Sequence, residues 1–344
     1  MTGDTAGSVP VRRRSWWSIV VLTVLMALGV IVATLVVLAL IPLRVGDLGA
    51  QPRPTATYDE AVAAFDAYGA DESGLGVVDD CHSRLFTGGE RTQNVIVLFH
   101  GLTNCPQQMV KLAEQLEQQG ANVVVLRAPG HGQASGPGGL AGIEAEQFRD
   151  FADRSIDIAT GLGDHVTVMG LSLGGLISTW TVIERPEVQR AVIIAPAYQL
   201  GGYSEPVQYA VGNLFARMPN VAIPSSGEGL GDHAYPETPT RGVGQMLRLG
   251  RYVMGQAAAR PPIGKQIAFV INDADTTISN AAAEQVIDEW RADGVDVTVV
   301  HLPKSLGLPH DLIDPAQAVQ DPALVYPLIE ALAEGRTPPP VPNG

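Results

Sequence analysis

Ser172 lies in the segment Gly170-Leu-Ser172-Leu-Gly174, which continues a β-branched run that starts at His165. A buried strand that passes through Gly-x-Ser-x-Gly directly into a helix holds its serine in a sharp, strained turn. Side chains at the two glycine positions would collide with neighbouring elements. The turn raises the hydroxyl at the sheet edge, beside the positive end of the helix. The spacing therefore predicts Ser172 as a nucleophile.

A nucleophilic serine needs a general base, and the base needs an acid that orients it. After a turn of this kind, the acid and then the base follow the serine in the chain, each after a later strand. The predicted strand Gln266–Ile271 is followed by two carboxylates, Asp273 and Asp275. Asp275 is favoured because it lies a few residues past the strand and precedes Thr276. Asp273 remains the alternative acid, or a residue that braces the loop.

Two histidines follow the last predicted strand, which ends at Val300. His301 still belongs to that strand, so its side chain is expected to pack or pair at the sheet edge. His310 lies on the loop beyond, where it can turn toward both Ser172 and Asp275. We therefore predict His310 as the general base.

Two backbone N–H groups are needed to stabilise the oxyanion of an acyl-transfer intermediate. One is expected from Leu173, the residue after the nucleophile. The other is expected from Leu102, in the loop that follows the buried run ending at Phe99. Gly101 would let the backbone approach the substrate, and His100 is expected to order this loop.

The elements that must position these residues alternate between strands and helices, which predicts βαβ units and a parallel sheet. Short β-branched runs mark the strands Asn94–Phe99, Asn122–Leu126, His165–Met169, Ala191–Ala195, Gln266–Ile271 and Val295–Val300. Helical stretches are Tyr58–Tyr68, Gln107–Gln119, Gly142–Thr160, Leu173–Glu184, Ala281–Arg291 and Ala323–Ala333. The expected fold class is α/β, with a mostly parallel central sheet flanked by helices.

From about Asn94 to the closing helix, the chain resembles the α/β-hydrolase superfamily. Within it, the chain is similar to the monoacylglycerol-lipase and serine-aminopeptidase-like branch and its carboxylesterases. The segment 127–136 is similar to that branch's Gly-His-Gly loop, although Ala128 stands where the branch usually has Asp. The resemblance implies an esterase or lipase-like activity with no metal or organic cofactor. It also implies a structural role for His131.

The interval from Ala195 to Gln266 breaks the alternation, because no strand–helix pair is predicted within it. A loop of this length in a compact domain is usually functional, and its aromatic residues suggest a lid over the sheet edge. The expected organisation is a cytoplasmic N-terminus (1–15), a transmembrane anchor (16–42), a stalk (43–57), a hydrolase core (58–197 and 263–335) interrupted by a lid (198–262), and a disordered tail (336–344).

The N-terminal region contains an uncharged apolar run, Ile19–Ile41, long enough to cross a bilayer. The arginines at 12–14 predict a cytoplasmic N-terminus, and Trp16 and Trp17 suit the membrane interface. A cleaved signal peptide is the alternative, with a secreted protein as its consequence. Signal peptides have a shorter apolar region and a small-x-small cleavage site, whereas Leu48 interrupts the nearest candidate site.

The chain has two cysteines, Cys81 and Cys105. Outside the cytoplasm, two thiols that lie close together tend to be paired. Cys81 precedes a predicted strand and Cys105 follows the end of that strand, so the chain can bring them together. We predict a disulfide, with two separate buried thiols as the alternative. No metal site is predicted from this spacing.

The net charge of −14 argues against nucleic acid as a partner, because phosphate binding needs concentrated Lys and Arg. The leading hypothesis is hydrolysis of a carboxylic ester, and a membrane anchor makes lipid-derived substrates plausible. A peptidase or amidase shares the same site geometry, and an acyltransferase shares the acyl-enzyme and differs only in its acceptor. A non-catalytic surface-binding protein is less favoured, because both oxyanion loops and the complete Ser–Asp–His order are present.

Overall fold

The structure is a computed structural model that describes residues 16–225, 233–264, 266–317 and 319–342. The predicted cytoplasmic N-terminus, residues 1–15, lies outside the described residues. The α-helices are α1 (Trp16–Leu40), α2 (Tyr58–Glu72), α3 (Gln107–Gln118), α4 (Ala145–Leu162), α5 (Leu173–Glu184), α6 (Glu205–Phe215), α7 (Thr240–Ala259), α8 (Asn280–Ala292) and α9 (Pro322–Ala333). The strands are β1 (Arg84–Phe86), β2 (Thr92–Phe99), β3 (Asn122–Val125), β4 (Gly163–Leu171), β5 (Val188–Ile194), β6 (Ala222–Pro224), β7 (Glu237–Pro239), β8 (Gln266–Asn272) and β9 (Val297–Leu302). Short 3₁₀ helices are η1 (Asp79–Cys81), η2 (Pro137–Gly142) and η3 (Lys304–Leu306).

The central sheet has the strand order β1-β3-β2-β4-β5-β8-β9. β1 pairs antiparallel with β3, and the other neighbours are parallel. Because β3 lies on one side of β2 and β4 on the other, the chain reverses its course across the sheet between β2 and β4. In open α/β sheets, ligands bind at the carboxyl ends of the strands at such a switch point. The loops after β2 and β4 are therefore brought together.

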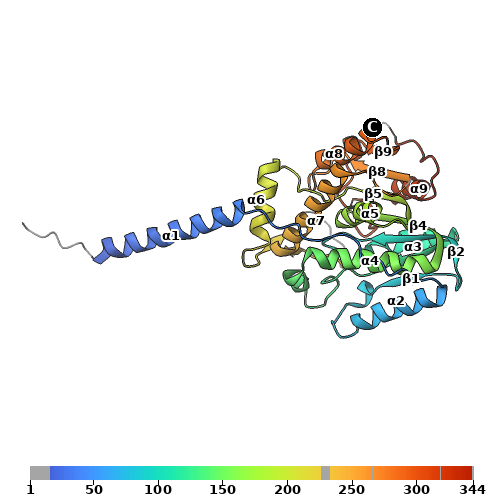
Figure 1. Cartoon of the computed structure of the whole chain (residues 1–344), viewed down its shortest axis with the longest axis horizontal. Helices are drawn as coiled ribbons and strands as arrows, with labels where there is room; N and C mark the ends of the chain where they lie inside the picture. The colour runs from blue at the N-terminus through green and yellow to red at the C-terminus, as the bar shows by residue number, and fades with distance from the viewer. Residues whose placement is uncertain (1–15, 226–232, 265, 318, 343–344) are drawn as a thin grey trace, which may run out of the picture.

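Helices cover both faces of the sheet (Figure 1). α3 connects β2 to β3, and α4 leads back to β4 in the opposite direction, so right-handed crossovers place these two helices on opposite faces. α5 packs with α4 and on β4 and β5, whereas α9 packs on the other face of the same strands. Gln119, at the end of α3, donates a hydrogen bond to Glu330 of α9. The predicted α/β class is confirmed.

The β-branched runs form the core, as predicted. In β3, Val123, Val124 and Val125 are fully buried, and so are Val95 and Val97 of β2. All six predicted strands are present, with ends that shift by at most three residues. The sequence did not predict β1, because a half-buried edge strand of three residues has no periodicity to recognise.

The insert, defined as residues 198–262, is more regular than the sequence predicted. It contains α6, the antiparallel pair β6–β7 and the 20-residue helix α7. Glycines interrupt the apolar pattern of α7. At two of them the helix approaches the backbone of other segments too closely for a side chain. A Cβ at Gly250 would lie 2.4 Å from the Tyr198 carbonyl oxygen, and one at Gly244 would lie 2.6 Å from the Ala216 nitrogen.

The segment predicted as a stalk, 43–57, lies on the domain rather than extending from it. Leu48 is fully buried, and its carbonyl accepts a hydrogen bond from the Trp180 indole. The backbone N–H of Gln51 donates to Asp153 at 2.7 Å, and that of Arg53 donates to Asp157 at 2.9 Å. The prolines prevent this segment from forming a helix, so its backbone N–H groups need acceptors from elsewhere. The carboxylates of α4 are those acceptors.

The two ends of the chain differ in how they meet the domain. α1 has 25 residues and none of them is buried, so it is a candidate membrane span or signal sequence by length and composition. In Figure 1 it extends away from the domain, which it reaches beside α6. At the other end, Val341 of the tail packs against the core, whereas residues 343–344 lie outside the described residues.

Candidate active site

Ser172 lies between β4 and α5 in a strained backbone conformation. Its φ of 60° and ψ of −114° are uncommon for a residue other than glycine. A Cβ on Gly170 would lie 2.2 Å from the Gly174 carbonyl oxygen, and one on Gly174 would lie 1.9 Å from the Phe99 carbonyl oxygen. Both glycines of the motif are thus required by close backbone contact. The backbone N–H of Ser172 donates to Ile194 of β5, which holds the turn against the sheet.

Asp275 and His310 are brought together by the loops after β8 and β9. His310 Nδ1 lies 2.5 Å from Asp275 Oδ2. The other carboxylate oxygen, Oδ1, accepts a hydrogen bond at 2.8 Å from the backbone N–H of Thr277. The Asp275 side chain is fully buried and that of His310 is 18% exposed. One side of the imidazole is therefore held by a fixed carboxylate.

The alternative acid and the alternative base pair with each other. His301 Nδ1 lies 2.9 Å from Asp273 Oδ1, and the two side chains are 49% and 36% exposed. His301 Nε2 also lies 3.5 Å from Glu284 of α8. His301 lies in β9, the last strand of the sheet, and it pairs at the sheet edge as the sequence suggested.

The loop after β2 has its carbonyl groups held by hydrogen bonds. The buried His100 donates from Nδ1 to the Gly101 carbonyl at 2.9 Å, because its Nε2 accepts the Ala128 N–H. The backbone N–H of Tyr235, from the insert, donates to Thr103 at 2.7 Å. Leu102 lines the cavity beside Ser172. An oxyanion role for the N–H groups of Leu102 and Leu173 stays a prediction.

A cavity of about 580 Å³ contains the predicted residues. Ser172, Asp275 and His310 all line it, at the carboxyl edge of the sheet. Much of the opposite wall comes from the insert, at Tyr203, Ile223, Pro224, Ser225, Thr238, Val243 and Met246. Within the described residues, no group of three or more His, Cys, Asp or Glu side chains is placed to hold a metal ion.

Comparison with known proteins finds proteins of similar sequence and fold. Residues 90–241 match the model of a hydrolase family described as serine aminopeptidase. Similar solved structures include a monoglyceride lipase of Saccharomyces cerevisiae, 14% identical with a TM-score of 0.57, which covers 75% of this chain and 92% of that one. A metagenome-derived lipolytic enzyme is 19% identical with a TM-score of 0.56, over 76% of this chain and 100% of that one. The monoacylglycerol lipase of Paleococcus ferrophilus is 18% identical with a TM-score of 0.53, over 67% and 90%.

The chain has the α/β-hydrolase fold. Its resemblance to the branch that contains monoacylglycerol lipases and serine aminopeptidases is confirmed by the matched family and these structures. No curated protein sequence matches it.

Two polar residues that the sequence pattern did not indicate hold the loops of the candidate site. The buried Asn272, at the end of β8, donates to the carbonyls of Leu308 and Pro309 at 3.0 and 2.9 Å and so fixes the loop of His310. Asp311 accepts from Gln108 Nε2 at 2.7 Å. Each lies within three residues of a predicted site residue. This proximity is the one feature of the sequence that could have indicated their role.

The side chain of Gln108 links Asp311 to the loop after β2. Gln108 donates from Nε2 to Asp311, and its Oε1 accepts the Gly101 N–H at 2.8 Å. Burial raises the pKa of the Asp311 carboxyl above its ordinary value. The hydrogen bonds that it accepts from backbone N–H groups and from Gln108 partly oppose this rise. The loops of His310 and Leu102 are therefore connected through one amide side chain.

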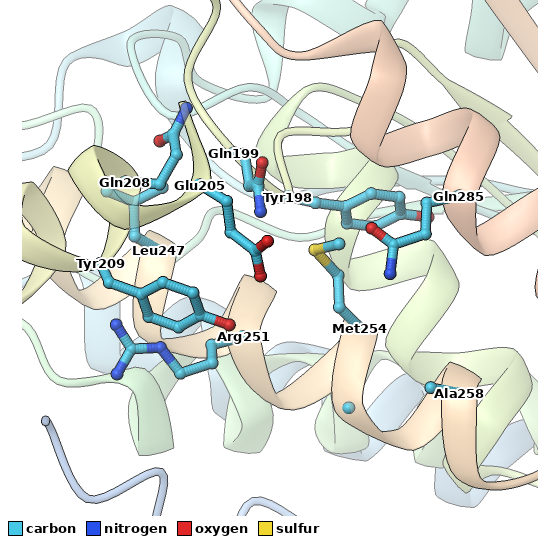
Figure 2. A pocket seen from close by; sticks show the side chains of 11 residues that line it. Tyr198, Gln199, Glu205, Gln208, Tyr209, Leu247, Arg251, Met254, Ala258 and Gln285 are labelled. Atoms are coloured by element: carbon cyan, nitrogen blue, oxygen red, sulfur yellow. The ribbon is translucent and has the colours of Figure 1, made fainter. Parts of the chain in front are cut away.

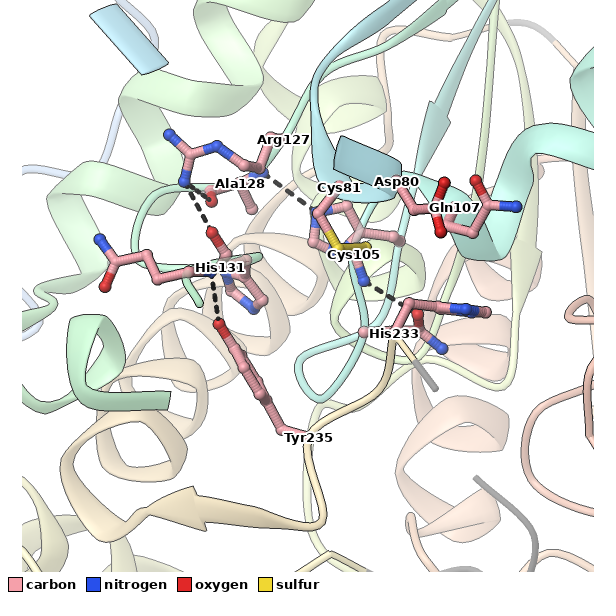
Figure 3. The surroundings of a disulfide bond; sticks show 12 residues. Asp80, Cys81, Cys105, Gln107, Arg127, Ala128, His131, His233 and Tyr235 are labelled. Carbon is pink, nitrogen blue, oxygen red and sulfur yellow. Dashed lines mark hydrogen bonds between the residues drawn. A yellow bond between two sulfur atoms is a disulfide. The ribbon is translucent and has the colours of Figure 1, made fainter. Parts of the chain in front are cut away.

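The structure contains the predicted disulfide between Cys81 and Cys105, with Cα atoms 5.3 Å apart. Figure 3 shows it beside Arg127 and His131 of the Gly-His-Gly loop. Cys105 ends the loop that carries Leu102, and Cys81 packs so closely on Gly132 that a Cβ there would lie 2.5 Å away. The bond therefore connects η1 to the predicted oxyanion loop.

Replacing both cysteines by alanine is expected to lower the free energy of unfolding by about 3 kcal/mol, because the unfolded chain loses a closed loop. The two cysteines are 24 residues apart in the sequence, which sets the length of that loop. Urea denaturation of the full chain in detergent measures the change. A reducing agent should bring the parent to the stability of the double variant and leave the variant unchanged. Equal midpoints for parent and variant would contradict the expectation.

His131 is buried where the Gly-His-Gly loop meets the predicted oxyanion loop. Its Nε2 lies 2.8 Å from the Leu102 carbonyl oxygen and its Nδ1 3.0 Å from that of Pro129. Burial lowers its pKa to about 4, against the opposing effect of these carbonyls. The neighbouring His100 has its pKa shifted in the same direction, mainly by burial. The structural role expected for His131 agrees with these contacts.

Stability is expected to fall as the pH is lowered from about 6.5 to about 4. The unfolded chain binds a proton on His131 near its ordinary pKa of 6.5, whereas the folded chain does so only at about 4. Stability from the neutral imidazole is thus complete above the unfolded pKa and is lost through this window, by on the order of 3 kcal/mol. Urea denaturation at several pH values measures the slope. The His131→Gln variant should show a shallower slope, and an unchanged slope would refute the assignment.

Proposed function

We propose that this α/β-hydrolase is a serine hydrolase that cleaves carboxylic esters through an acyl-enzyme on Ser172. The hydrogen bond between Asp275 and His310, in the cavity that Ser172 also lines, carries the proposal. Asp275 holds His310 Nδ1, so Nε2 is the ring nitrogen that takes the proton of the Ser172 hydroxyl. The lipolytic and monoacylglycerol-lipase names of the similar structures support an ester as the substrate.

Each group has a defined role in the proposed reaction. The Ser172 oxygen attacks the ester carbonyl while His310 takes its proton, and the buried Asp275 stabilises the imidazolium. The N–H groups of Leu102 and Leu173 stabilise the tetrahedral oxyanion, close to the positive end of α5. His310 then returns the proton to the leaving alcohol. Water attacks the acyl-enzyme by the same route and regenerates Ser172.

The cavity supports an apolar acyl group as part of the substrate. Its volume of about 580 Å³ is in the range of small-molecule sites. The wall from the insert includes the apolar side chains of Ile223, Val243 and Met246. In the proposal these side chains bind the acyl chain and the insert acts as the lid.

We further propose that α1 is a retained single-pass anchor, with the N-terminus cytoplasmic and the catalytic domain outside the cytoplasm. Its helix is apolar along its whole length and none of it is buried by the domain. The disulfide suits an oxidising compartment. A secreted form after signal cleavage is the alternative, which the N-terminal sequence of the mature protein tests.

Hydrolysis of p-nitrophenyl esters over a series of chain lengths tests the proposed function. The full chain in detergent should hydrolyse these esters, with a length preference set by the cavity. Aminoacyl p-nitroanilides should be hydrolysed far more slowly, and faster hydrolysis of the anilides would favour the peptidase or amidase alternative. Failure on both substrates and with a fluorophosphonate probe would favour a binding role. Ester formation with an added alcohol in place of hydrolysis would favour an acyltransferase.

A further inference from the structure

The C-terminal end of α1 is capped by side chains of the insert. Asn213 of α6 donates to the Ala39 carbonyl at 2.8 Å, and its Oδ1 accepts the backbone N–H of Leu43 at 3.0 Å. The guanidinium of Arg217 donates to the carbonyls of Leu38 and Pro42, both at 2.9 Å, and also to that of Ile41. The carbonyls of Leu38 and Ala39 belong to the last turn of α1, where a helix leaves its carbonyls without intrahelical partners, and those of Ile41 and Pro42 follow directly after it. The apolar helix and α6 are therefore joined at a defined point.

This junction places α6 at the level where α1 leaves a bilayer. A helix of 25 residues is about 37 Å long, compared with about 30 Å for the hydrocarbon core. The capped carbonyls at the end of α1 therefore belong in the interfacial region. Since α6 packs against this end, it must lie at the same depth, beside the lipid headgroups.

The exposed side of α6 and the loop before it suit that environment. Tyr203 is 54% exposed, Val207 41% and Tyr209 40%. Tyrosine side chains favour the membrane interface because the ring is apolar and the hydroxyl is polar. Tyr203 also lines the cavity of Ser172, so the catalytic cavity borders the same surface.

Cationic side chains accompany this apolar surface in a chain whose net charge is −14. Arg44, Arg217 and Arg251 have no carboxylate at ion-pair distance within the part of the chain that the structure describes. Other arginines of the insert do have one, as Arg248 has in Glu146. Arg217 already donates to the carbonyls at the end of α1, so Arg44 and Arg251 are the two of these that are available to an anion from outside the protein.

Arg251 lines a second cavity, of about 300 Å³, between α6, α7 and α8 (Figure 2). Its guanidinium lies 4.3 Å from the centre of the Tyr209 ring, and its amino groups donate only to Asn213 Oδ1, at 3.3 and 3.4 Å, among the described residues. Burial lowers the pKa of Arg251, and the nearby charge of Arg217 acts in the same direction. The Glu205 carboxylate also lines this cavity but makes no ion pair with Arg251. A phosphate would supply the missing counter-charge in the bidentate geometry that arginine prefers.

We propose that the membrane face, defined as Tyr203, Val207, Tyr209, Arg217 and Arg251, rests on the bilayer beside α1, with Arg251 binding the phosphate of a phospholipid headgroup. The proposal rests on the proposed retention of α1 as an anchor. It assigns the insert a second role besides covering the cavity, because the insert then fixes the cavity of Ser172 at the lipid surface. Lipid-derived esters would reach Ser172 from the bilayer without crossing bulk water.

Site-specific fluorescence quenching in proteoliposomes tests the membrane face. The two native cysteines are bonded to each other, so one introduced cysteine is the only reactive thiol. Three variants each carry one fluorophore-labelled cysteine: Val207→Cys on α6, Val30→Cys within α1, and Ala323→Cys on α9. The helix α9 lies far from α1 in Figure 1. Val30 is 66% exposed, and Ala323 is also exposed. The vesicles contain phosphatidylcholine and phosphatidylglycerol with a quencher near the headgroup end of the acyl chains.

Lipid quenching at least several-fold stronger at 207 than at 323, together with quenching at 30, is the expected result. Quenching at 30 with none at 207 would overturn the membrane face and leave the anchor intact. Quenching at neither position would overturn both proposals. Ester hydrolysis in detergent is measured separately, so that failure of the proposed reaction is distinguished from either result.

Lipid binding by the full chain in detergent tests the role of Arg251. Native mass spectrometry is expected to show retention of one phosphatidylglycerol but not of diacylglycerol, which lacks the phosphate. Arg251→Gln should weaken retention at least about tenfold and Arg251→Lys less, whereas Arg91→Gln, which removes a surface pair with Asp164, should not weaken it. Equal retention by the parent and the Arg251→Gln variant would overturn the phosphate assignment.

Discussion

Replacing Ser172 by alanine is expected to lower kcat for ester hydrolysis by about 10⁴- to 10⁶-fold. The substitution removes the attacking oxygen and leaves the cavity and its hydrogen bonds in place, so KM should change little. It should also leave the backbone turn unchanged. Alanine has a Cβ as serine does, so both residues bear the same strain at the φ of 60°. Steady-state kinetics with a p-nitrophenyl ester measure the loss, and a fluorophosphonate should no longer label the protein.

Ser225 offers a matched control for this substitution. It lines the same cavity, but its hydroxyl lies 3.3 Å from Thr238 and is not part of the proposed relay. Ser225→Ala should therefore keep kcat within a few-fold of the parent. If Ser172→Ala retained most of the activity, or if both variants lost it equally, Ser172 would not be the nucleophile.

Replacing Asp275 by asparagine is expected to lower kcat by about 10⁴-fold. The asparagine oxygen can still accept the N–H of Thr277, as Asp275 Oδ1 does at 2.8 Å, so the loop should keep its shape. The amide nitrogen that then faces His310 donates a hydrogen bond, which favours the wrong tautomer and leaves the imidazolium without a counter-charge. Kinetics over a range of pH measure the effect.

Asp273 is the matched control for Asp275, because it lies two residues away and also pairs with a histidine. Its partner His301 is exposed and does not line the cavity. Asp273→Asn should leave kcat within a few-fold of the parent, since an exposed ion pair contributes little. A larger loss in Asp273→Asn than in Asp275→Asn would reverse the assignment of the acid.

The local features of the site could be predicted from the sequence because their causes are local. The glycines at 170 and 174 are required by backbone contacts within one turn and with the adjacent strand, and this requirement is written in the motif. The strands were recognisable because burial on both faces selects continuous β-branched runs. The disulfide followed from two cysteines at the two ends of one strand unit.

Features that depend on contacts between distant segments could not be predicted in this way. Nothing in the sequence shows that Asp153 and Asp157 of α4 accept hydrogen bonds from the backbone of residues 51 and 53. The segment 43–57 was therefore predicted to be a stalk from its prolines and its lack of periodicity. The glycines of α7 weakened its helical pattern because their function is close approach to other segments, which is not visible in the sequence of α7 itself.

By itself, the sequence determined the α/β class, the position of Ser172 in a strand–turn–helix motif, and the order in which an acid and a base follow it. It could only rank Asp275 over Asp273 and His310 over His301, because each pair lies on one short segment. The tertiary structure decided which of these side chains meet, since the loops after β8 and β9 come together only when the two strands pair. It also decided that α6 caps the end of α1. That contact joins residues more than 170 positions apart, and only folding brings them within reach.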